Sequence, residues 1–262
     1  MTSPEPLRGV LHPDRAAGLF QLFSHQPSAG LAPFVEFHWI VRWDLRGRPP
    51  HEQKVLAHPN IHLVFEEPQA AVYGVDRGLF VRRLEGQGQV HGVKFRPGGF
   101  RGLRGGPVQE LTDRVSPAAD VFGPEVERVN RRILPLEDQS AMVALAEEFL
   151  LARLPAPDPV AAEVAAMVDT ATADHSLVRV EQLAERCGTS VRTLQRLFAE
   201  YVGASPKWVL RRARLQEAAL RADTGTVDWP LLAADLGYAD QSHLSRDFTA
   251  VVGQPPTRYA RG

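Results

Sequence analysis

One helical pattern is written twice in the last third of the chain, and this repeat limits what that region can fold into. Each copy has a glycine, then a Leu-x-Arg-x-Phe run, then a second glycine. The landmarks recur at a spacing of 50 residues, in the pairs Leu194 and Leu244, Arg196 and Arg246, Phe198 and Phe248, and Gly203 and Gly253. Gly188 and Gly237 are 49 residues apart, so the second copy carries one extra residue after its first glycine. The repeat indicates two copies of one supersecondary unit.

Each copy has the pattern of two helices joined by a short turn. In the first, Leu183 and Ala184 fall on one helical face, Gly188 suits the left-handed end of a helix, and Ser190 is a good N-cap for the next helix. We predict one helix-turn-helix unit over about 180–201 and a second over about 229–252. A single copy would be equally typical of a plain helical hairpin, but two copies in register favour the paired unit.

A long helix is predicted between the two copies. Ser205 is its N-cap, Pro206 takes the first helical position, and apolar residues recur at helical spacing to about residue 222. Its length would be about 25 Å at about 1.5 Å per residue. Successive major-groove segments on one face of DNA lie about 34 Å apart. One chain could therefore present two helices to adjacent groove segments.

The polar side chains that these units leave exposed are types that contact DNA. Arg, Gln, Ser, Thr and His reach base edges and phosphates in the major groove. The candidate DNA-binding residues are Ser190, Arg192, Thr193, Gln195 and Arg196 in the first copy and Gln241, Ser242, His243, Ser245 and Arg246 in the second.

From about Pro159 to Arg261 the chain resembles the DNA-binding domain of the AraC/XylS family of transcription regulators. The match includes Leu194-Gln195-Arg196-Leu197-Phe198, Gly203-Ala204-Ser205-Pro206, Asp240-Gln241-Ser242-His243-Leu244, and Gly253-x-Pro255-Pro256. The resemblance implies a domain of seven helices, over 159–262, that binds double-stranded DNA sequence-specifically. It also implies contact with RNA polymerase if the chain is an activator.

Charge and cysteine content narrow the class of protein. Lys plus Arg is 30 and Asp plus Glu is 31, so the formal charge of −1 does not suit a coat protein that binds DNA by charge alone. Positive charge is instead local, at Arg192, Arg196, Lys207, Arg211, Arg212 and Arg214, although Arg211 and Arg212 are also typical of a solvated helix face. Cys187 is the single cysteine; it suits a reducing cytosol and a core position. Residues 1–13 lack the apolar core of a signal peptide, and no apolar run would span a membrane, so we expect a cytoplasmic protein.

The first half has the pattern of an antiparallel β domain. Residues 34–43 alternate with a period of two, Val35, Phe37, Trp39, Val41 and Trp43 against Glu36, His38, Ile40 and Arg42. Further short apolar runs at 19–23, 61–65, 71–73, 79–84 and 90–95 are separated by turn residues such as Gly86-Gln87-Gly88. We predict a cupin-like barrel or sandwich with trailing helices, one of them over Ser140–Leu154, in a domain of residues 1–154. The fold class is thus α+β and multidomain, with an all-α second domain.

Residues 155–158 form a proline-rich linker, which we expect to hold the two halves apart while they reorient. The first half resembles sensor-like domains that precede AraC-type DNA-binding domains, on segments such as His58-Pro59-Asn60 and Gly92-Val93-Lys94-Phe95-Arg96-Pro97. That resemblance implies a domain that senses a small-molecule effector or forms a homodimer, without naming the ligand.

A metal-dependent cupin-type enzyme fused to a DNA-binding domain is the alternative reading. Its local candidate ligands are His58, His62, Glu66 and Glu67, but they span a turn into a strand, which favours structural histidines. The glycine-rich segment 96–103 lacks the ending of a phosphate loop and indicates a turn. We therefore expect no catalytic residue, metal or cofactor. A third possibility is a first half that only dimerises, through the helix over Ser140–Leu154.

Overall fold

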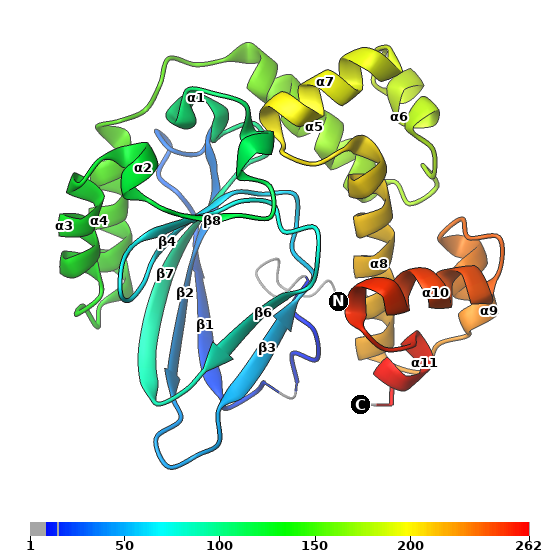
Figure 1. Ribbon diagram of the computed structural model, residues 1–262, viewed down its shortest axis with the longest axis horizontal. Coiled ribbons are helices and arrows are strands. Elements are labelled where there is room, and N and C mark those ends of the chain that lie inside the picture. Colours follow the sequence, from blue (N-terminus) through cyan, green and yellow to red (C-terminus); the bar gives the residue numbers. More distant parts are fainter. Residues whose placement is uncertain (1–8, 15, 262) are drawn as a thin grey trace.

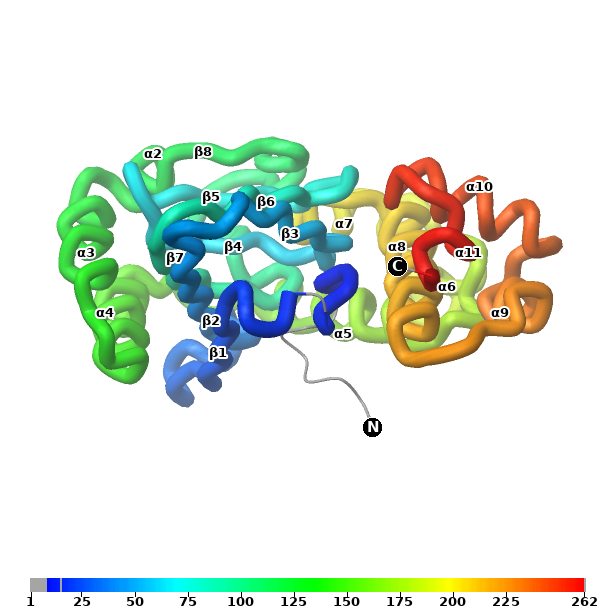
Figure 2. Tube along the Cα trace, turned by 90° about the horizontal axis from the view of Figure 1, so that it is seen from below, coloured from blue at the N-terminus to red at the C-terminus, as the bar shows by residue number. Residues whose placement is uncertain are grey.

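The computed structural model describes residues 9–14 and 16–261. The molecule is elongated. Helices α3 and α4 lie at one end, and α6, α9 and α10 lie at the other (Figure 2). A β domain fills the first half and a helical domain the second (Figure 1).

The first half contains two antiparallel sheets. The strands are β1 (Phe20–His25), β2 (Val35–Asp44), β3 (His51–Val55), β4 (His62–Phe65), β5 (Ala71–Tyr73), β6 (Phe80–Leu84), β7 (Gln87–Phe95) and β8 (Val115–Pro117). Six of them form a sheet in the order β1-β2-β7-β4-β5-β8, and β3 pairs with β6 in a two-stranded ribbon. The larger sheet is open at β1 and β8, so the domain is a sandwich and not a closed barrel.

The two faces of the larger sheet are covered by different elements. Successive residues of a strand point to opposite faces, so β2 contributes side chains to both. On one face, His38 and Ile40 of β2 are fully buried, and His38 lies 3.4 Å from Glu147 of α4. On the other face, Phe37, Trp39 and Val41 point toward the β3–β6 ribbon. The face of β2 that carries His38 is therefore packed against α4. On the opposite face, Trp39 and Val41 are half-buried.

Helices before and after β8 complete the first half. They are α1 (Arg101–Arg104), the 3-10 helix η2 (Val108–Leu111), α2 (Ala119–Phe122), α3 (Glu125–Ile133) and α4 (Gln139–Leu151). The glycine-rich segment 96–103 forms the turn into α1, where Gly98 has a φ of 85° that favours glycine. Helix α4 occupies most of the predicted 140–154, and dimerisation through it stays a prediction.

The described part of the second half is made of seven helices. They are α5 (Pro159–Ala173), α6 (Val180–Arg186), α7 (Val191–Tyr201), α8 (Pro206–Thr224), α9 (Trp229–Asp235), α10 (Gln241–Val252) and α11 (Pro256–Tyr259). Helix α8 stands between the β domain and α9–α11 (Figure 1). Among residues 9–14 and 16–261, none of the helices combines the length and hydropathy needed to span a lipid bilayer.

The expectation that the linker holds the two halves apart is wrong. One hydrophobic core runs from Leu31 in the β domain to Leu210 in α8 and includes residues of α5, α6 and α7. Polar contacts support it, since Tyr201 Oη donates to Asp158 at 2.8 Å and Gly98 N donates to Tyr201 O at 3.1 Å. A second core joins α8–α11 to Leu11 and Leu56 of the first half. The β domain thus packs against both helix-turn-helix units.

Candidate nucleic-acid interface

The first helix-turn-helix unit, α6 and α7, is built from the local signals in its sequence. Gly188 ends α6 with a φ of 63°, and the Ser190 hydroxyl accepts the Thr193 N–H at 3.1 Å to begin α7. Leu194, Leu197 and Phe198 are buried. Because these apolar residues fix the rotation of α7, the opposite face carries the exposed side chains of Arg192, Gln195 and Arg196.

The second unit, α9 and α10, repeats this construction. Gly237 has a φ of 68°, and a Cβ there would overlap the Val178 side chain. Asp240 caps α10 by accepting the His243 N–H at 2.7 Å. Leu244, Phe248 and Val252 are buried, and the exposed residues of the first turns are Ser242, His243 and Arg246, with Gln241 and Ser245 half-buried beside them.

Three of the ten predicted contact residues, Ser190, Thr193 and Arg246, already have local partners for their side chains. The Ser190 hydroxyl both caps α7 and lies 3.0 Å from the Thr193 hydroxyl. The Arg246 Nε donates to Ser242 O at 3.3 Å, one turn earlier in α10, which leaves the rest of its guanidinium exposed. All ten residues lie on α7, on α10 or at the start of α7, so the structure gathers them on two helices.

Each of these two helices contains one acidic residue, and each acid is bound by an arginine from another element. Glu200 of α7 accepts two hydrogen bonds from Arg101 of α1, at 2.9 and 2.6 Å. Asp247 of α10 accepts from Arg211 of α8 at 2.7 Å and from Tyr238 Oη at 2.9 Å. Burial alone would raise the pKa of Asp247, but these hydrogen bonds and the nearby guanidinium charges hold that pKa below its ordinary value. Negative charge that would repel phosphates is neutralised on both helices.

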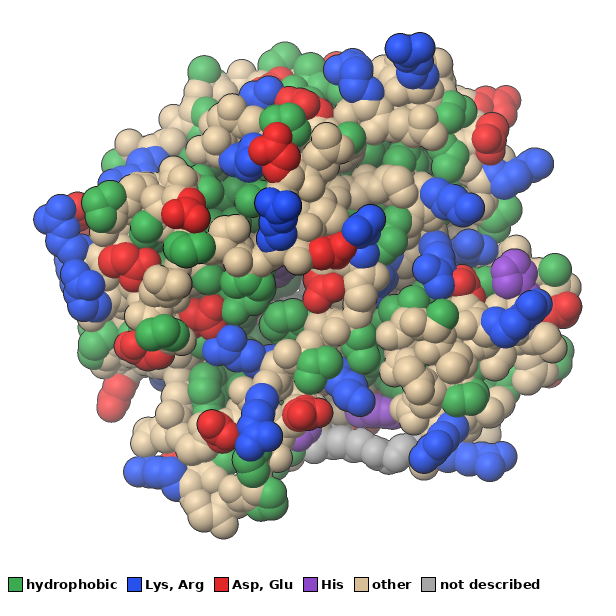
Figure 3. All heavy atoms as spheres, in the orientation of Figure 1, with side chains coloured by type: hydrophobic (Ala, Val, Ile, Leu, Met, Phe, Trp, Pro, Cys, Tyr) green, Lys and Arg blue, Asp and Glu red, His purple; other side chains and the backbone are tan. Residues whose placement is uncertain are grey.

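The predicted cluster of six basic residues is not one surface, which corrects the sequence reading. Arg211 is bound to Asp247, and Arg214 lies over the Tyr238 ring at 4.6 Å. Arg212 is 2 % exposed and contacts the β domain. Of the six, Arg192, Arg196 and Lys207 remain exposed. On the face in Figure 3, Lys and Arg side chains lie over both helix-turn-helix units, interspersed with few acids.

Helix α8 is fastened to two loops of the β domain. Arg212 Nη2 donates to Arg77 O and Gly78 O, both at 2.7 Å, and its guanidinium lies 4.8 Å from the Trp208 ring centroid. One turn further along α8, Gln216 Nε2 donates to Leu56 O at 2.7 Å. Burial lowers the pKa of Arg212 to about 10, so it keeps its charge at neutral pH.

These two loops border a cavity of about 330 Å³ between the larger sheet and the β3–β6 ribbon. Its walls are mainly apolar and aromatic. The lining includes Leu22, Phe37, Trp39, Val41, Trp43, Val55, Ala57, His62, Val64, Tyr73, Asp76, Phe80 and Val90. Pockets of this volume and composition bind small molecules in many proteins.

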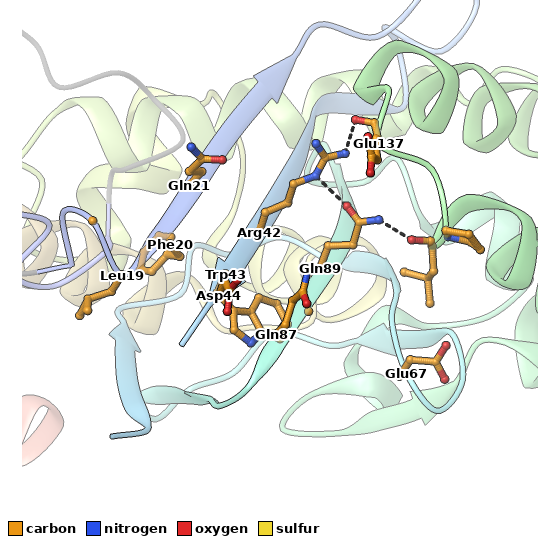
Figure 4. A pocket seen from close by; sticks show the side chains of 14 residues that line it. Leu19, Phe20, Gln21, Arg42, Trp43, Asp44, Glu67, Gln87, Gln89 and Glu137 are labelled. Carbon is orange, nitrogen blue, oxygen red and sulfur yellow. Dashed lines mark hydrogen bonds between the residues drawn. The ribbon is translucent and has the colours of Figure 1, made fainter. Parts of the chain in front are cut away.

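A second hollow, of about 950 Å³, lies across the end of β1 and β2 and is more open to solvent. Figure 4 shows Arg42, Gln89 and Glu137 along one side of it. Arg42 Nε donates to Gln89 Oε1 at 2.7 Å, and Gln89 Nε2 donates to Leu134 O and, at 2.9 Å, to Leu136 O. Because these polar groups are already bonded to one another, the more sheltered cavity between the sheet and the ribbon is the better ligand site.

Two members of the candidate metal set, His62 and Glu66, are bound to other side chains. His62 Nδ1 accepts from Trp39 Nε1 at 3.1 Å. Glu66 accepts from Tyr73 Oη at 2.6 Å and pairs with Arg82 at 2.8 Å. Within the described part of the chain, no cluster of three or more His, Cys, Asp or Glu is arranged to hold a metal ion.

Two further histidines lie on the opposite face of the sheet. His38 Nδ1 and His91 Nε2 are 3.1 Å apart, and both rings are fully buried. Burial lowers the pKa of His38 to about 4 despite the nearby Glu147, and burial followed by the His38 charge lowers the pKa of His91. Both rings are therefore neutral at pH 7.

Comparison with known proteins agrees with this geometry. Residues 183–262 match the family described as a helix-turn-helix domain, and residues 23–117 match a domain of unknown function, DUF6597. A protein named as an AraC-like transcription regulator of Streptomyces lividans is 29 % identical over 238 residues, which cover 79 % of this chain and 77 % of that protein. The chain is therefore similar to AraC-like transcription regulators over most of its length. It carries an AraC-type helix-turn-helix domain and is a DNA-binding regulator.

Other AraC-type proteins are similar over part or all of the chain. The transcriptional activator RhaS of Pectobacterium carotovorum is 32 % identical over 74 residues, 28 % of this chain and 26 % of RhaS. Among solved structures, ToxT from Vibrio cholerae covers 92 % of the chain at 9 % identity with a TM-score of 0.40. The C-terminal domain of AraT from Geobacillus stearothermophilus covers 40 % at 23 % identity with a TM-score of 0.37.

Proposed function

We propose that the two helix-turn-helix units of one chain read two adjacent major-groove segments on one face of a DNA duplex. Helices α7 and α10 would enter the groove, and α8 would set their spacing. Its 19 residues give a length of about 28 Å at about 1.5 Å per residue, close to the repeat of about 34 Å between groove segments.

The arginines of the two reading helices carry this proposal. Arg196 and Arg246 are exposed, and no acid among residues 9–14 and 16–261 forms an ion pair with either of them. The acids of the same helices, Glu200 and Asp247, are bound by other arginines. A guanidinium that is exposed and free of carboxylates is available to a guanine edge or a phosphate.

The remaining predicted residues take supporting roles. Arg192 and Gln195 flank Arg196, and Ser242 and His243 lie one turn before Arg246, so these four can contact neighbouring bases or phosphates. The side chains of Ser190 and Thr193 are used at the start of α7, where they position its first turn. Gln241 and Ser245 are half-buried at the edge of the α10 surface.

We further infer that the β domain senses a small molecule and changes the DNA affinity of the helices. The support is that α8 is fastened to residues next to those that line the cavity. Arg212 binds Arg77 O and Gly78 O, between the lining residues Asp76 and Phe80, and Gln216 binds Leu56 O, between Val55 and Ala57. A ligand that moves either loop alters the contacts of α8. Homodimerisation and contact with RNA polymerase stay predictions.

Half-site binding tests the DNA-reading proposal. With a duplex selected by the protein, Arg196→Ala and Arg246→Ala should each weaken specific binding by about 1–3 kcal/mol. Arg196→Ala should bind the duplex equally well whether one of its two blocks is intact or scrambled, and it should still discriminate at the other block. Arg246→Ala should show the opposite pattern. Arg221→Ala is the matched control, because Arg221 pairs with Glu217 and Asp235 away from both reading helices. Unchanged affinity of both variants would remove these assignments.

A further inference from the structure

The floor of the cavity is made by two tryptophans that lie against glycines of the neighbouring strand. In the pairing of β2 with β7, Trp39 is opposite Gly92 and Trp43 is opposite Gly88. A Cβ atom at either glycine would overlap the indole of its partner. Each indole therefore covers bare backbone, which requires glycine at both positions of β7.

The edges of the two indoles are also fixed. Trp39 Nε1 donates to His62 Nδ1 at 3.1 Å, and Trp43 Nε1 donates to Glu85 O at 3.0 Å. The N–H of each indole is thus satisfied within the protein, and one side of each ring lies against a glycine. What the two side chains present to the cavity is aromatic ring surface.

The walls extend this aromatic surface. Trp39 and Trp43 are four residues apart in β2, about 13 Å at about 3.3 Å per residue, and Val41 lies between them on the same face. Tyr73 and Phe80 meet edge to face at 5.9 Å between ring centroids, and both line the cavity. A flat molecule could therefore stack on the floor while its edges contact other rings.

The charged groups deep in the cavity already neutralise one another. Lys94 is 6 % exposed, bonds Glu36 at 2.8 Å and lies 4.9 Å from the Phe37 ring centroid. Arg82 pairs with Glu66 at 2.8 Å. A charged ligand would lose its hydration there without gaining a free counter-charge, which disfavours it.

The other charged residues of the lining do not change this balance. Asp113 and Arg114 are exposed to solvent, and Asp113 is bound by Arg77. Asp76 accepts the Gly78 N–H at 2.7 Å. Burial, and then the charge of Lys94, lower the pKa of His62 to about 3, so this ring is neutral and carries its proton on Nε2. The polar group beside Trp39 is therefore an uncharged donor.

We propose that the cavity binds an uncharged, planar aromatic molecule that stacks on Trp39 and Trp43. This assignment names the ligand class for the sensing role proposed above and rests on it. A saturated molecule of the same size would fill the space but lose the ring-to-ring contacts. At the buried charged groups of the lining, Lys94 and Glu66, a carboxylate or an ammonium ion of the same size would meet charges that are already paired.

Three probes that share one fused two-ring skeleton test the ligand class on the full chain. Calorimetric titration would compare 2-naphthol, its saturated analogue decahydro-2-naphthol, and the anion 2-naphthoate at pH 7. We expect 2-naphthol to bind with a Kd lower than that of the saturated alcohol by about 2- to 12-fold for each stacked tryptophan. We expect 2-naphthoate to bind at least about ten-fold more weakly than 2-naphthol. Equal affinities for the two alcohols, or tighter binding of the anion, would overturn the proposal.

Tryptophan variants locate the probe. Trp39→Leu and Trp43→Leu keep an apolar side chain but remove the ring. At least one of them, at the tryptophan on which the probe stacks, should raise the Kd of 2-naphthol by about 2- to 12-fold while changing that of the saturated alcohol little. Trp229→Leu, in α9 and outside the cavity lining, is the matched control and should bind 2-naphthol as the wild type does. Circular dichroism identifies any variant that fails to fold, and for such a variant Trp→Phe replaces Trp→Leu and should keep most of the affinity. An unchanged Kd in both folded leucine variants contradicts the site.

A DNA-binding assay separates this proposal from the sensing role. If 2-naphthol binds with the expected pattern but leaves DNA affinity unchanged, the ligand class stands and the sensing role fails. If 2-naphthol does not bind, while a charged compound binds the β domain and changes DNA affinity, the sensing role stands and the ligand class is wrong.

Discussion

The Arg211 guanidinium lies 2.7 Å from the Asp247 carboxylate and joins the connecting helix α8 to the reading helix α10. Tyr238 donates to the second carboxylate oxygen at 2.9 Å. Asp247 is next to Arg246 in sequence, so its charge would otherwise act directly on the reading surface. One ion pair therefore joins α10 to α8 and neutralises a negative charge beside the surface proposed to contact DNA.

Replacing Arg211 should affect stability and DNA binding together. In Arg211→Met the half-buried Asp247 loses its main partner, and we expect the free energy of unfolding to fall by about 1 kcal/mol, since both side chains are partly exposed. DNA affinity should fall as well, because the freed carboxylate repels phosphates. Urea unfolding and DNA titration measure the two effects.

A double-mutant cycle separates the pair from its surroundings. Asp247→Asn keeps the shape of the side chain and removes its charge, so the double variant Arg211→Met/Asp247→Asn should recover part of the DNA affinity that Arg211→Met loses. If the two substitutions act additively on DNA affinity, the carboxylate is not what the arginine neutralises.

The contact of Arg212 with the β domain should control the order of the loop at 75–79. Arg212→Met removes two hydrogen bonds and leaves the carbonyls of Arg77 and Gly78 without this donor. We expect the free energy of unfolding to fall by about 1–3 kcal/mol and amide exchange in residues 75–79 to become faster. Hydrogen exchange read by mass spectrometry measures the loop directly.

Arg221→Met is the matched control for this prediction, because Arg221 is on the same helix but pairs with Glu217 and Asp235 within the helical domain. It should leave exchange at 75–79 as in the wild type. If residues 75–79 exchange in Arg212→Met at the wild-type rate, the loop is held by other contacts and α8 does not act through it.

The buried histidines should make the protein less stable in acid. In the folded chain the pKa is lowered from 6.5 to about 4 for His38 and to about 3 for His62, and it is also lowered for His91. Below about pH 6.5 the unfolded chain therefore binds more protons than the folded chain. The free energy of unfolding should fall as pH drops, by up to about 1.4 kcal/mol per pH unit for each histidine, until the folded pKa is reached.

The variant His62→Asn tests this sign and its origin. The asparagine oxygen can still accept from Trp39 Nε1, but the side chain no longer titrates. Urea unfolding at pH 7.5 and pH 5 should show a smaller loss of stability for the variant than for the wild type. Equal losses in both proteins would assign the acid sensitivity to other groups.

The helical half could be predicted closely from sequence because its signals are local. Ser190 and Ser205 cap helices as expected, and Gly188 and Gly237 take the left-handed conformation that ends the first helix of each unit. Caps, glycines and apolar spacing act over a few residues, so one sequence is enough to read them. The connecting helix was likewise expected at Pro206 and extends two residues beyond the predicted end.

The β half was harder to predict, since its structure depends on pairs distant in sequence. Strand β3 was missed because its buried residue is Gln53, and β8 because it is short and ends in Pro117. Gly88 was read as part of a turn but lies in β7 opposite Trp43. Trp39 and Trp43 are four residues apart, and so are Gly88 and Gly92. This equal spacing indicates that each tryptophan lies opposite a glycine, but only once the strand register is known.

Contacts between the halves gave no signal in the sequence. Arg212 lies between Arg211 and Arg214 in the sequence, a pattern typical of an exposed or DNA-contacting residue. In the structure it is buried against Arg77 and Gly78, about 135 residues earlier in the chain. Helical periodicity reports which face of α8 is apolar, and it does not report which other domain covers a charged residue on that helix.

Selection from a random duplex pool at about 150 mM salt tests the central claim, that one chain reads DNA with two helices. The full chain should enrich a motif of two blocks about one DNA turn, about 10–10.5 base pairs, apart. Selection with Arg196→Ala should retain one block and selection with Arg246→Ala the other. Enrichment of a single block that either variant abolishes entirely would contradict the account.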